Sequence, residues 1–84
     1  MKTTRLIGID PGIVITGFCV LDFFKSKTKL VAYGTMKPPK KDRLERRLMY
    51  LYDESFSLIS KFCPSIMVIE DSFYSKNVKS AVVL

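Results

Sequence analysis

Apolar residues follow two patterns along the chain, and each pattern predicts a different kind of element. Two runs, 5–10 and 65–70, are apolar without alternation, which is typical of strands buried on both faces. The run 13–24 is rich in β-branched and aromatic residues, and a polar loop separates it from a further apolar run at 30–36. We therefore expect an antiparallel meander of three strands, with 65–70 as a fourth strand.

Helical spacing appears between the third and fourth of these runs. Asp42 followed by Glu45 is a variant of the capping box that begins a helix, and Pro64 marks its end. One apolar stripe, at steps of three, four or their sums, runs along this helix: Leu44, Leu48, Leu51, Leu58 and Phe62. A strand reached through a crossover helix should lie parallel to an earlier strand. The pattern thus predicts an α/β fold with a mixed sheet.

The tail, 71–84, begins as a loop, after which Ser75 or Asn77 could cap a second helix. The inner face of that helix would carry Val78, Ala81 and Val82. The chain stops inside an apolar run, and only one complete helix accompanies strands that are apolar on both faces. We expect a sheet truncated before its fifth strand, whose second covering layer is missing or comes from a partner.

Composition narrows the function classes. The 84 residues suffice for one small domain, 1–84, and 48% of them are apolar. The net charge of +6 fits a polyanionic partner such as nucleic acid, or a basic domain without such a partner. The absence of histidine excludes a Ser-His-Asp triad, a histidine general base and the usual zinc sites. Cys19 and Cys63 are expected to be buried reduced thiols. No run is long enough to span a membrane, and a cytoplasmic protein is expected.

Two carboxylates follow the two continuously apolar runs. If these strands are parallel neighbours, which sit about 5 Å apart, Asp10 and Glu70 lie at the same edge of the sheet and could both reach one ion. Two close carboxylates repel unless a cation separates them, and Mg²⁺ prefers such oxygen ligands. The alternatives are a turn-forming aspartate before Pro11 and a solvated glutamate at a strand end. These interpretations stay open on the residues alone.

The loop after Glu70 combines aromatic and basic side chains. Phe73 and Tyr74 beside Lys76 suggest base stacking and phosphate contact. The alternative is that Phe73 packs under the loop as part of the core. The lysines before the helix form a basic loop that could add non-specific affinity for DNA.

Several of these motifs together resemble a known family, the RuvC Holliday junction resolvases. The opening motif is Gly8-Ile9-Asp10-Pro11-Gly12, followed by Thr16-Gly17-Phe18. Further along, in the family's order and spacing, come Arg47-Leu48, Tyr52, Phe62, Pro64, Ile69-Glu70, Phe73, Lys76-Asn77 and Ser80-Ala81. The resemblance runs over nearly the whole chain.

The resemblance implies a ribonuclease H-like fold and a crossover junction endodeoxyribonuclease. Such enzymes are Mg²⁺-dependent homodimers, with Mn²⁺ as a substitute, that cut four-way DNA junctions in recombination and repair beside a branch-migration helicase complex. Asp10 and Glu70 match the first two metal-binding catalytic acids. The residues that the resemblance assigns to DNA binding are Phe73, Lys76, Asn77 and Thr16.

The chain departs from the family in length, since members are about twice as long, and no acidic residue follows Asp71. We therefore expect an N-terminal fragment that is inactive or nearly so by itself. One alternative is a non-catalytic DNA-binding remnant. The other is a nucleotide-binding domain like those of actin and Hsp70, although Ile13 stands where that group has Ser or Thr.

Overall fold

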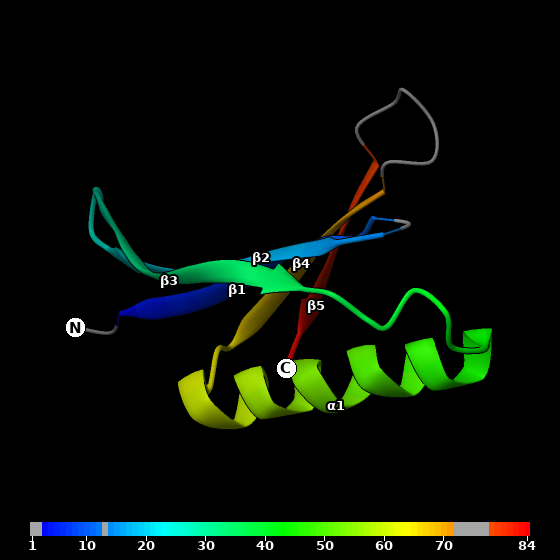
Figure 1. Ribbon diagram of the computed structural model, residues 1–84. Coiled ribbons are helices and arrows are strands. Elements are labelled where there is room, and N and C mark those ends of the chain that lie inside the picture. The colour runs from blue at the N-terminus through cyan, green and yellow to red at the C-terminus, as the bar shows by residue number, and fades with distance from the viewer. Residues whose placement is uncertain (1–2, 13, 72–77) are drawn as a thin grey trace.

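The computed structural model describes residues 3–12, 14–71 and 78–84. Within them, a five-stranded sheet carries a single long helix across one face (Figure 1). The elements in chain order are β1 (Thr4–Asp10), β2 (Thr16–Phe24), β3 (Lys27–Met36), α1 (Leu44–Phe62), β4 (Ile66–Asp71) and β5 (Val78–Val83). The strand order across the sheet is β3-β2-β1-β4-β5. The predicted meander, crossover helix and parallel fourth strand are confirmed.

The register of the sheet fixes which residues share an edge. β1 pairs with β2 antiparallel, and Asp10 lies opposite Gly17. β1 pairs with β4 parallel, and Ile9 lies opposite Ile69. The carboxyl ends of β1 and β4 therefore lie side by side at one end of the sheet. We call this end of the strands the carboxylate edge. The start of β2 and the end of β3 lie at the same edge, because Thr16 is opposite Met36.

The helix begins later than the capping-box pattern predicts, so the assignment of Asp42 as its N-cap is wrong. Arg43 occupies the N-cap position in an extended conformation, without a side-chain cap. The backbone N–H of Asp42 instead donates to the Pro39 carbonyl at 3.3 Å, which closes a turn before the helix. The predicted end of the helix is confirmed. Cys63 adopts a left-handed conformation, and its N–H donates to the Ile59 carbonyl at 2.8 Å.

The apolar stripe of α1 is only partly covered. Leu51, Leu58 and Phe62 are half-buried, whereas Leu44 and Leu48 are 64% and 56% exposed. The helix of 19 residues is about 28 Å long and lies displaced toward the end of the sheet where β1 finishes (Figure 1). The first turns of α1 consequently project beyond the strand ends (Figure 1).

The tail contradicts two expectations, the second helix and the end of the sheet after four strands. Val78–Val83 is a fifth strand, antiparallel to β4, with Val82 opposite Met67. The free edge of β4 offers unpaired backbone groups, and a segment rich in valine pairs with it more readily than it forms a helix. The proposed capping residues Ser75 and Asn77 lie outside the described residues.

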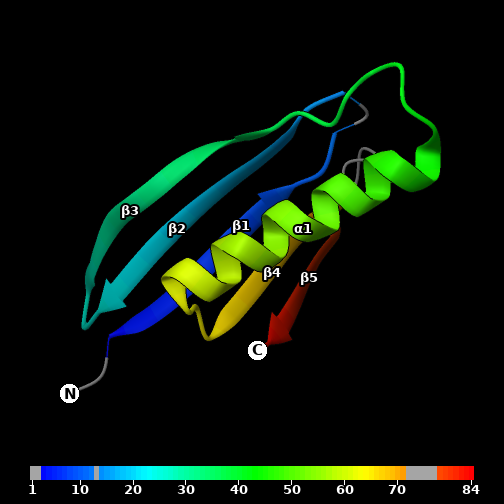
Figure 2. The same cartoon turned by 60° about the horizontal axis from the view of Figure 1, so that its bottom comes forward.

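The two faces of the sheet differ in cover. The helix α1 lies across one face (Figure 2). The buried apolar side chains among the described residues are Ile7, Val20 and Met36, at 0%, 0% and 3% exposure, and Met36 contacts Ser55 of α1. No helix in the described ranges covers the opposite face. None of the described helical residues forms a stretch long and apolar enough to cross a membrane.

Candidate metal site at the sheet edge

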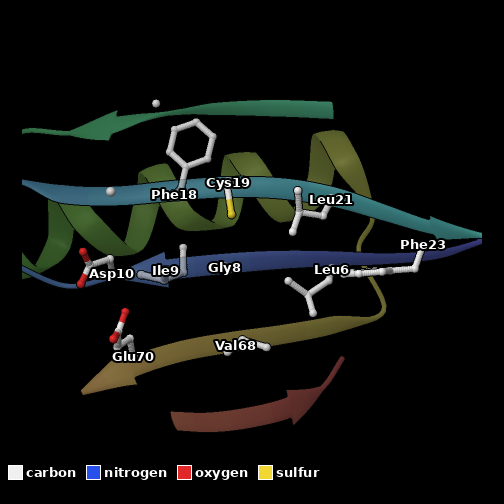
Figure 3. Close-up of a pocket in the computed structure, with 12 residues that line it drawn as sticks. Leu6, Gly8, Ile9, Asp10, Phe18, Cys19, Leu21, Phe23, Val68 and Glu70 are labelled. Carbon is white, nitrogen blue, oxygen red and sulfur yellow. The ribbon is translucent and has the colours of Figure 1, made fainter. Parts of the chain in front are cut away.

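Asp10 and Glu70 lie side by side on the uncovered face of the sheet. Each directly follows one member of the parallel pair Ile9 and Ile69, and neighbouring strands are about 4.8 Å apart. Figure 3 shows both carboxyl groups at the same end of the sheet and on the same face. Asp10 is exposed and Glu70 is half-buried, so solvent and ligands reach both.

Local sequence explains why Asp10 is presented in this way. Pro11 cannot donate a hydrogen bond to a sheet ladder, which ends β1 at the carboxylate. A Cβ atom on Gly12 would lie 2.1 Å from the Ile15 carbonyl oxygen, so the turn that follows has no room for a side chain there. Across the ladder, a Cβ on Gly17 would lie 4.0 Å from that of Asp10. Glycine at that position leaves the space beside the carboxylate open.

The two carboxylates stand at one end of an open depression of about 480 Å³. Its walls include the apolar side chains of Leu6, Leu21 and Val68, which line the uncovered face between β2, β1 and β4 (Figure 3). Gly8 deepens the floor, since a Cβ there would lie only 3.1 Å from the sulfur of Cys19. The depression is therefore acidic at one end and apolar along its walls.

The donor set fits a hard divalent cation in part. Asp10 and Glu70 supply carboxylate oxygens from two rigid neighbouring strands. Among the described residues, no group of three or more His, Cys, Asp or Glu side chains could hold a metal ion. Mg²⁺ commonly binds through one or two carboxylates and completes its octahedron with water and substrate phosphate. The pair thus offers part of the ligands of a hydrated Mg²⁺ ion and is too sparse for a closed structural metal site.

A third acidic side chain, Asp22, belongs to a different part of the fold. Two nitrogens of Arg5 donate to its two oxygens at 2.8 and 2.9 Å, and a third donates to the Phe62 carbonyl at 3.1 Å. The hydrogen bond from Arg5 lowers the pKa of Asp22 below its ordinary value of 3.8, and the same bond raises the pKa of Arg5. This cluster ties the C-terminal end of α1 to the end of the sheet that lies away from Asp10 and Glu70.

Of the other predicted site residues, only Thr16 lies within the described part of the chain. Thr16 is 5% exposed, lies beside Gly17 at the start of β2, and does not line the depression. The predicted DNA-binding residues Phe73, Lys76 and Asn77 lie outside the described residues. The wall formed by Leu6, Leu21 and Val68 was missed, because a strand apolar on both faces gives no signal for the side left uncovered.

The expectation for the cysteines holds in part. Both are free thiols. Cys19 is half-buried and lines the depression. Cys63 is exposed, so its predicted burial is wrong. Cys63 occupies the C-terminal cap of α1, where its thiol donates to the Ser60 carbonyl at 3.4 Å.

Comparison with known proteins gives a consistent result. A family model described as "Crossover junction endodeoxyribonuclease RuvC" matches residues 6–84. A protein of that name from Finegoldia magna is 40% identical over 78 residues, which cover 93% of this chain and 48% of that protein. One from Fusobacterium nucleatum is 42% identical over 78 residues, covering 93% and 41%. The chain therefore spans about half the length of the curated relatives it matches.

Solved structures show the same architecture. "T. thermophilus RuvC in complex with Holliday junction substrate" matches with a TM-score of 0.76 and 23% identity, covering 87% of this chain and 46% of that chain. "Thermus thermophilus RuvC structure" gives a TM-score of 0.74 at 22% identity, covering 83% and 46%. At these identities the likeness shows the shared fold.

Proposed function

Since the chain belongs to the RuvC family of crossover junction endodeoxyribonucleases, we propose that it forms the N-terminal part of a Mg²⁺-dependent endonuclease that resolves Holliday junctions in DNA recombination and repair. The observation that carries the proposal is the placement of Asp10 and Glu70 on adjacent parallel strands, at one accessible edge. The proposal includes a cytoplasmic homodimer that acts beside a branch-migration helicase complex. Family membership supports that part.

The chain's own contribution to this function is the pair of carboxylates that would hold the metal ion. Asp10 and Glu70 hold negative charge on a rigid ladder, where a hydrated Mg²⁺ ion and a phosphate oxygen can share the same space. When bound, such an ion activates water and stabilises the leaving oxygen in phosphodiester hydrolysis. The chain has no histidine, so its carboxylates carry this site. Phe73, Lys76 and Asn77 are the residues that we propose to contact DNA, and Thr16 is left out of this set because it is buried.

A chimeric enzyme tests the proposal directly. Residues 1–84 would replace the matching part of the Finegoldia magna relative, and the product would be incubated with a synthetic four-way junction and Mg²⁺. We expect symmetric cleavage by the chimera and little or none by the 84-residue chain alone, because two carboxylates are an incomplete set of ligands. Mn²⁺ should replace Mg²⁺.

Matched variants distinguish the loss of a site carboxylate from a general change in the protein's charge. Asp10→Asn or Glu70→Gln in the chimera should abolish cleavage, whereas Asp53→Asn and Glu54→Gln on the exposed side of α1 should leave it intact. A chimera that binds the junction but cuts no better than its Asp10→Asn variant would favour a non-catalytic DNA-binding remnant. Tight ATP binding without junction binding would favour the nucleotide-binding alternative.

A further inference from the structure

A basic connection joins β3 to α1. Five cationic side chains in this connection and the first turn of α1 are exposed: Lys37, Lys40, Lys41, Arg43 and Arg46. Only two acidic residues, Asp42 and Glu45, interrupt them. The positive end of the helix dipole lies at the same place, where the first backbone N–H groups of α1 have no partner within the helix. This region therefore combines side-chain charge and backbone dipoles of one sign.

The sheet register places this connection near the carboxylate pair. Asp10 lies opposite Gly17, and Gly17 lies opposite Thr35, so two strand spacings, about 10 Å, separate Asp10 from Thr35. Lys37 follows two residues later, at the same edge of the sheet. The basic connection thus begins about 10 Å from the proposed metal site and extends to roughly 20 Å, judged from strand spacing and rise. Figure 2 shows the connection at the end of the sheet to which β1 runs.

The connection is held in place by the fold. Met36, the last residue of β3, is 3% exposed, and the Ser55 hydroxyl on α1 donates to its sulfur at 3.9 Å. Pro38 is buried, and the Asp42 N–H to Pro39 carbonyl bond closes the turn. Lysines carried on such a fixed backbone lose less freedom on binding than lysines on a mobile tail.

We propose that the connection 37–43 and the first turn of α1 bind the phosphates of the DNA strand that flanks the cleavage position. The inference rests on the proposed function, because the distance is counted from the carboxylate pair. DNA rises about 3.4 Å per nucleotide, so 10–20 Å corresponds to roughly three to six nucleotides from the phosphate at Asp10 and Glu70. Contacts of this kind set the position of the DNA and carry no sequence information.

The test uses the 84-residue chain, with DNA binding measured by fluorescence anisotropy from 50 to 300 mM KCl. EDTA is present, so that cleavage plays no part. Lys40→Gln with Lys41→Gln removes two charges from the basic connection. Lys27→Gln with Lys29→Gln removes two charges from the β2–β3 hairpin, at the opposite end of the sheet. These control lysines are exposed and lie about 20 Å or more from Asp10 along the strands.

Two phosphate contacts contribute a salt slope of about 1.8 in log K against log salt. Loss of both should weaken binding by about 10- to 60-fold at 100 mM salt and reduce the slope by that amount. The effect should be equal on a linear duplex and on a four-way junction, because both present the same phosphates. The hairpin pair should change affinity by less than about 2-fold, since it lies more than a Debye length away.

Three outcomes would overturn the inference. The first is an equal loss of DNA affinity in the two lysine double variants. The second is a loss of affinity that appears on the four-way junction but not on the linear duplex. The third is that the unmodified chain shows no salt-dependent DNA binding. Failure of the proposed function is seen separately. If the chimera does not cut but the two lysine pairs differ as expected, the nuclease assignment fails and the phosphate contact stands.

Discussion

Replacing Asp10 with asparagine removes one of two like charges that follow the parallel pair Ile9 and Ile69, on strands that lie about 5 Å apart. Their repulsion is about 0.8 kcal/mol in bulk water and about 3 kcal/mol at an effective dielectric constant of 20. Asp10 is exposed and 0.15 M salt screens charges over about 8 Å, so the lower part of this range applies. Without metal, Asp10→Asn should therefore stabilise the chain by about 1 kcal/mol, which raises Tm by roughly 4–8 °C in a domain of this size.

Mg²⁺ should reverse the order of thermal stability, so that the unmodified chain melts at a higher temperature than Asp10→Asn. If the pair binds Mg²⁺ with a Kd of about 1 mM, 10 mM Mg²⁺ stabilises the unmodified chain by about 1.4 kcal/mol, or roughly 6–11 °C. Asp10→Asn leaves Glu70 as a single carboxylate and should show almost no shift. The assay is thermal unfolding followed by circular dichroism, in EDTA and in 10 mM Mg²⁺.

The control is Asp53→Asn, which makes the same charge change on the exposed side of α1. It should alter stability by less than about 0.5 kcal/mol in both buffers and keep the Mg²⁺ shift. The reasoning is refuted if Asp10→Asn lowers Tm in EDTA while retaining the full Mg²⁺ shift. That result would mean that Asp10 stabilises the strand end and that Glu70 is not its electrostatic neighbour.

Three further predictions concern packing and pH. Ile7→Ala, at a fully buried position, should lower the free energy of unfolding in urea by about 2–5 kcal/mol; a loss below about 1 kcal/mol would contradict the assigned core. Gly12→Ala should cost about 1–3 kcal/mol because its Cβ would meet a backbone oxygen at 2.1 Å, whereas Gly17→Ala should be neutral or slightly stabilising in the same melts. The lowered pKa of Asp22 means that its pairing with Arg5 adds stability above pH 4 and loses it as the pH falls below the ordinary value of 3.8. Asp22→Asn should flatten the acid limb of stability measured between pH 7 and pH 2, and an unchanged limb would show that the pair does not couple to folding.

The local sequence was sufficient for much of the fold. Runs without alternation identified β1 and β4 as internal strands, and a crossover helix between them required parallel pairing. That topology alone brought Asp10 and Glu70 to one edge. Pro64 was enough to predict the end of α1, because proline cannot continue a helix.

Other features depended on neighbours that are distant in sequence. Leu44 and Leu48 carry the helical pattern of a buried stripe, but the first turns of α1 project beyond the strand ends, and both side chains are exposed (Figure 1). The burial of Thr16 follows from its place opposite Met36 under α1. The position of the basic connection beside the carboxylate edge follows from the antiparallel return of β3. None of these facts is encoded in a single stretch of sequence.

The sequence by itself determined the first four strands, the crossover and the placement of Asp10 and Glu70 at the ends of two parallel strands, because each depends on a local pattern or on one chain-connection rule. Tertiary structure decided which face of the sheet stays open, and whether Val78–Val83 forms a helix or a strand. A segment with three valines in six residues is compatible with either form. The free backbone edge of β4 selects the strand, because an unpaired ladder next to it is satisfied only by extended chain.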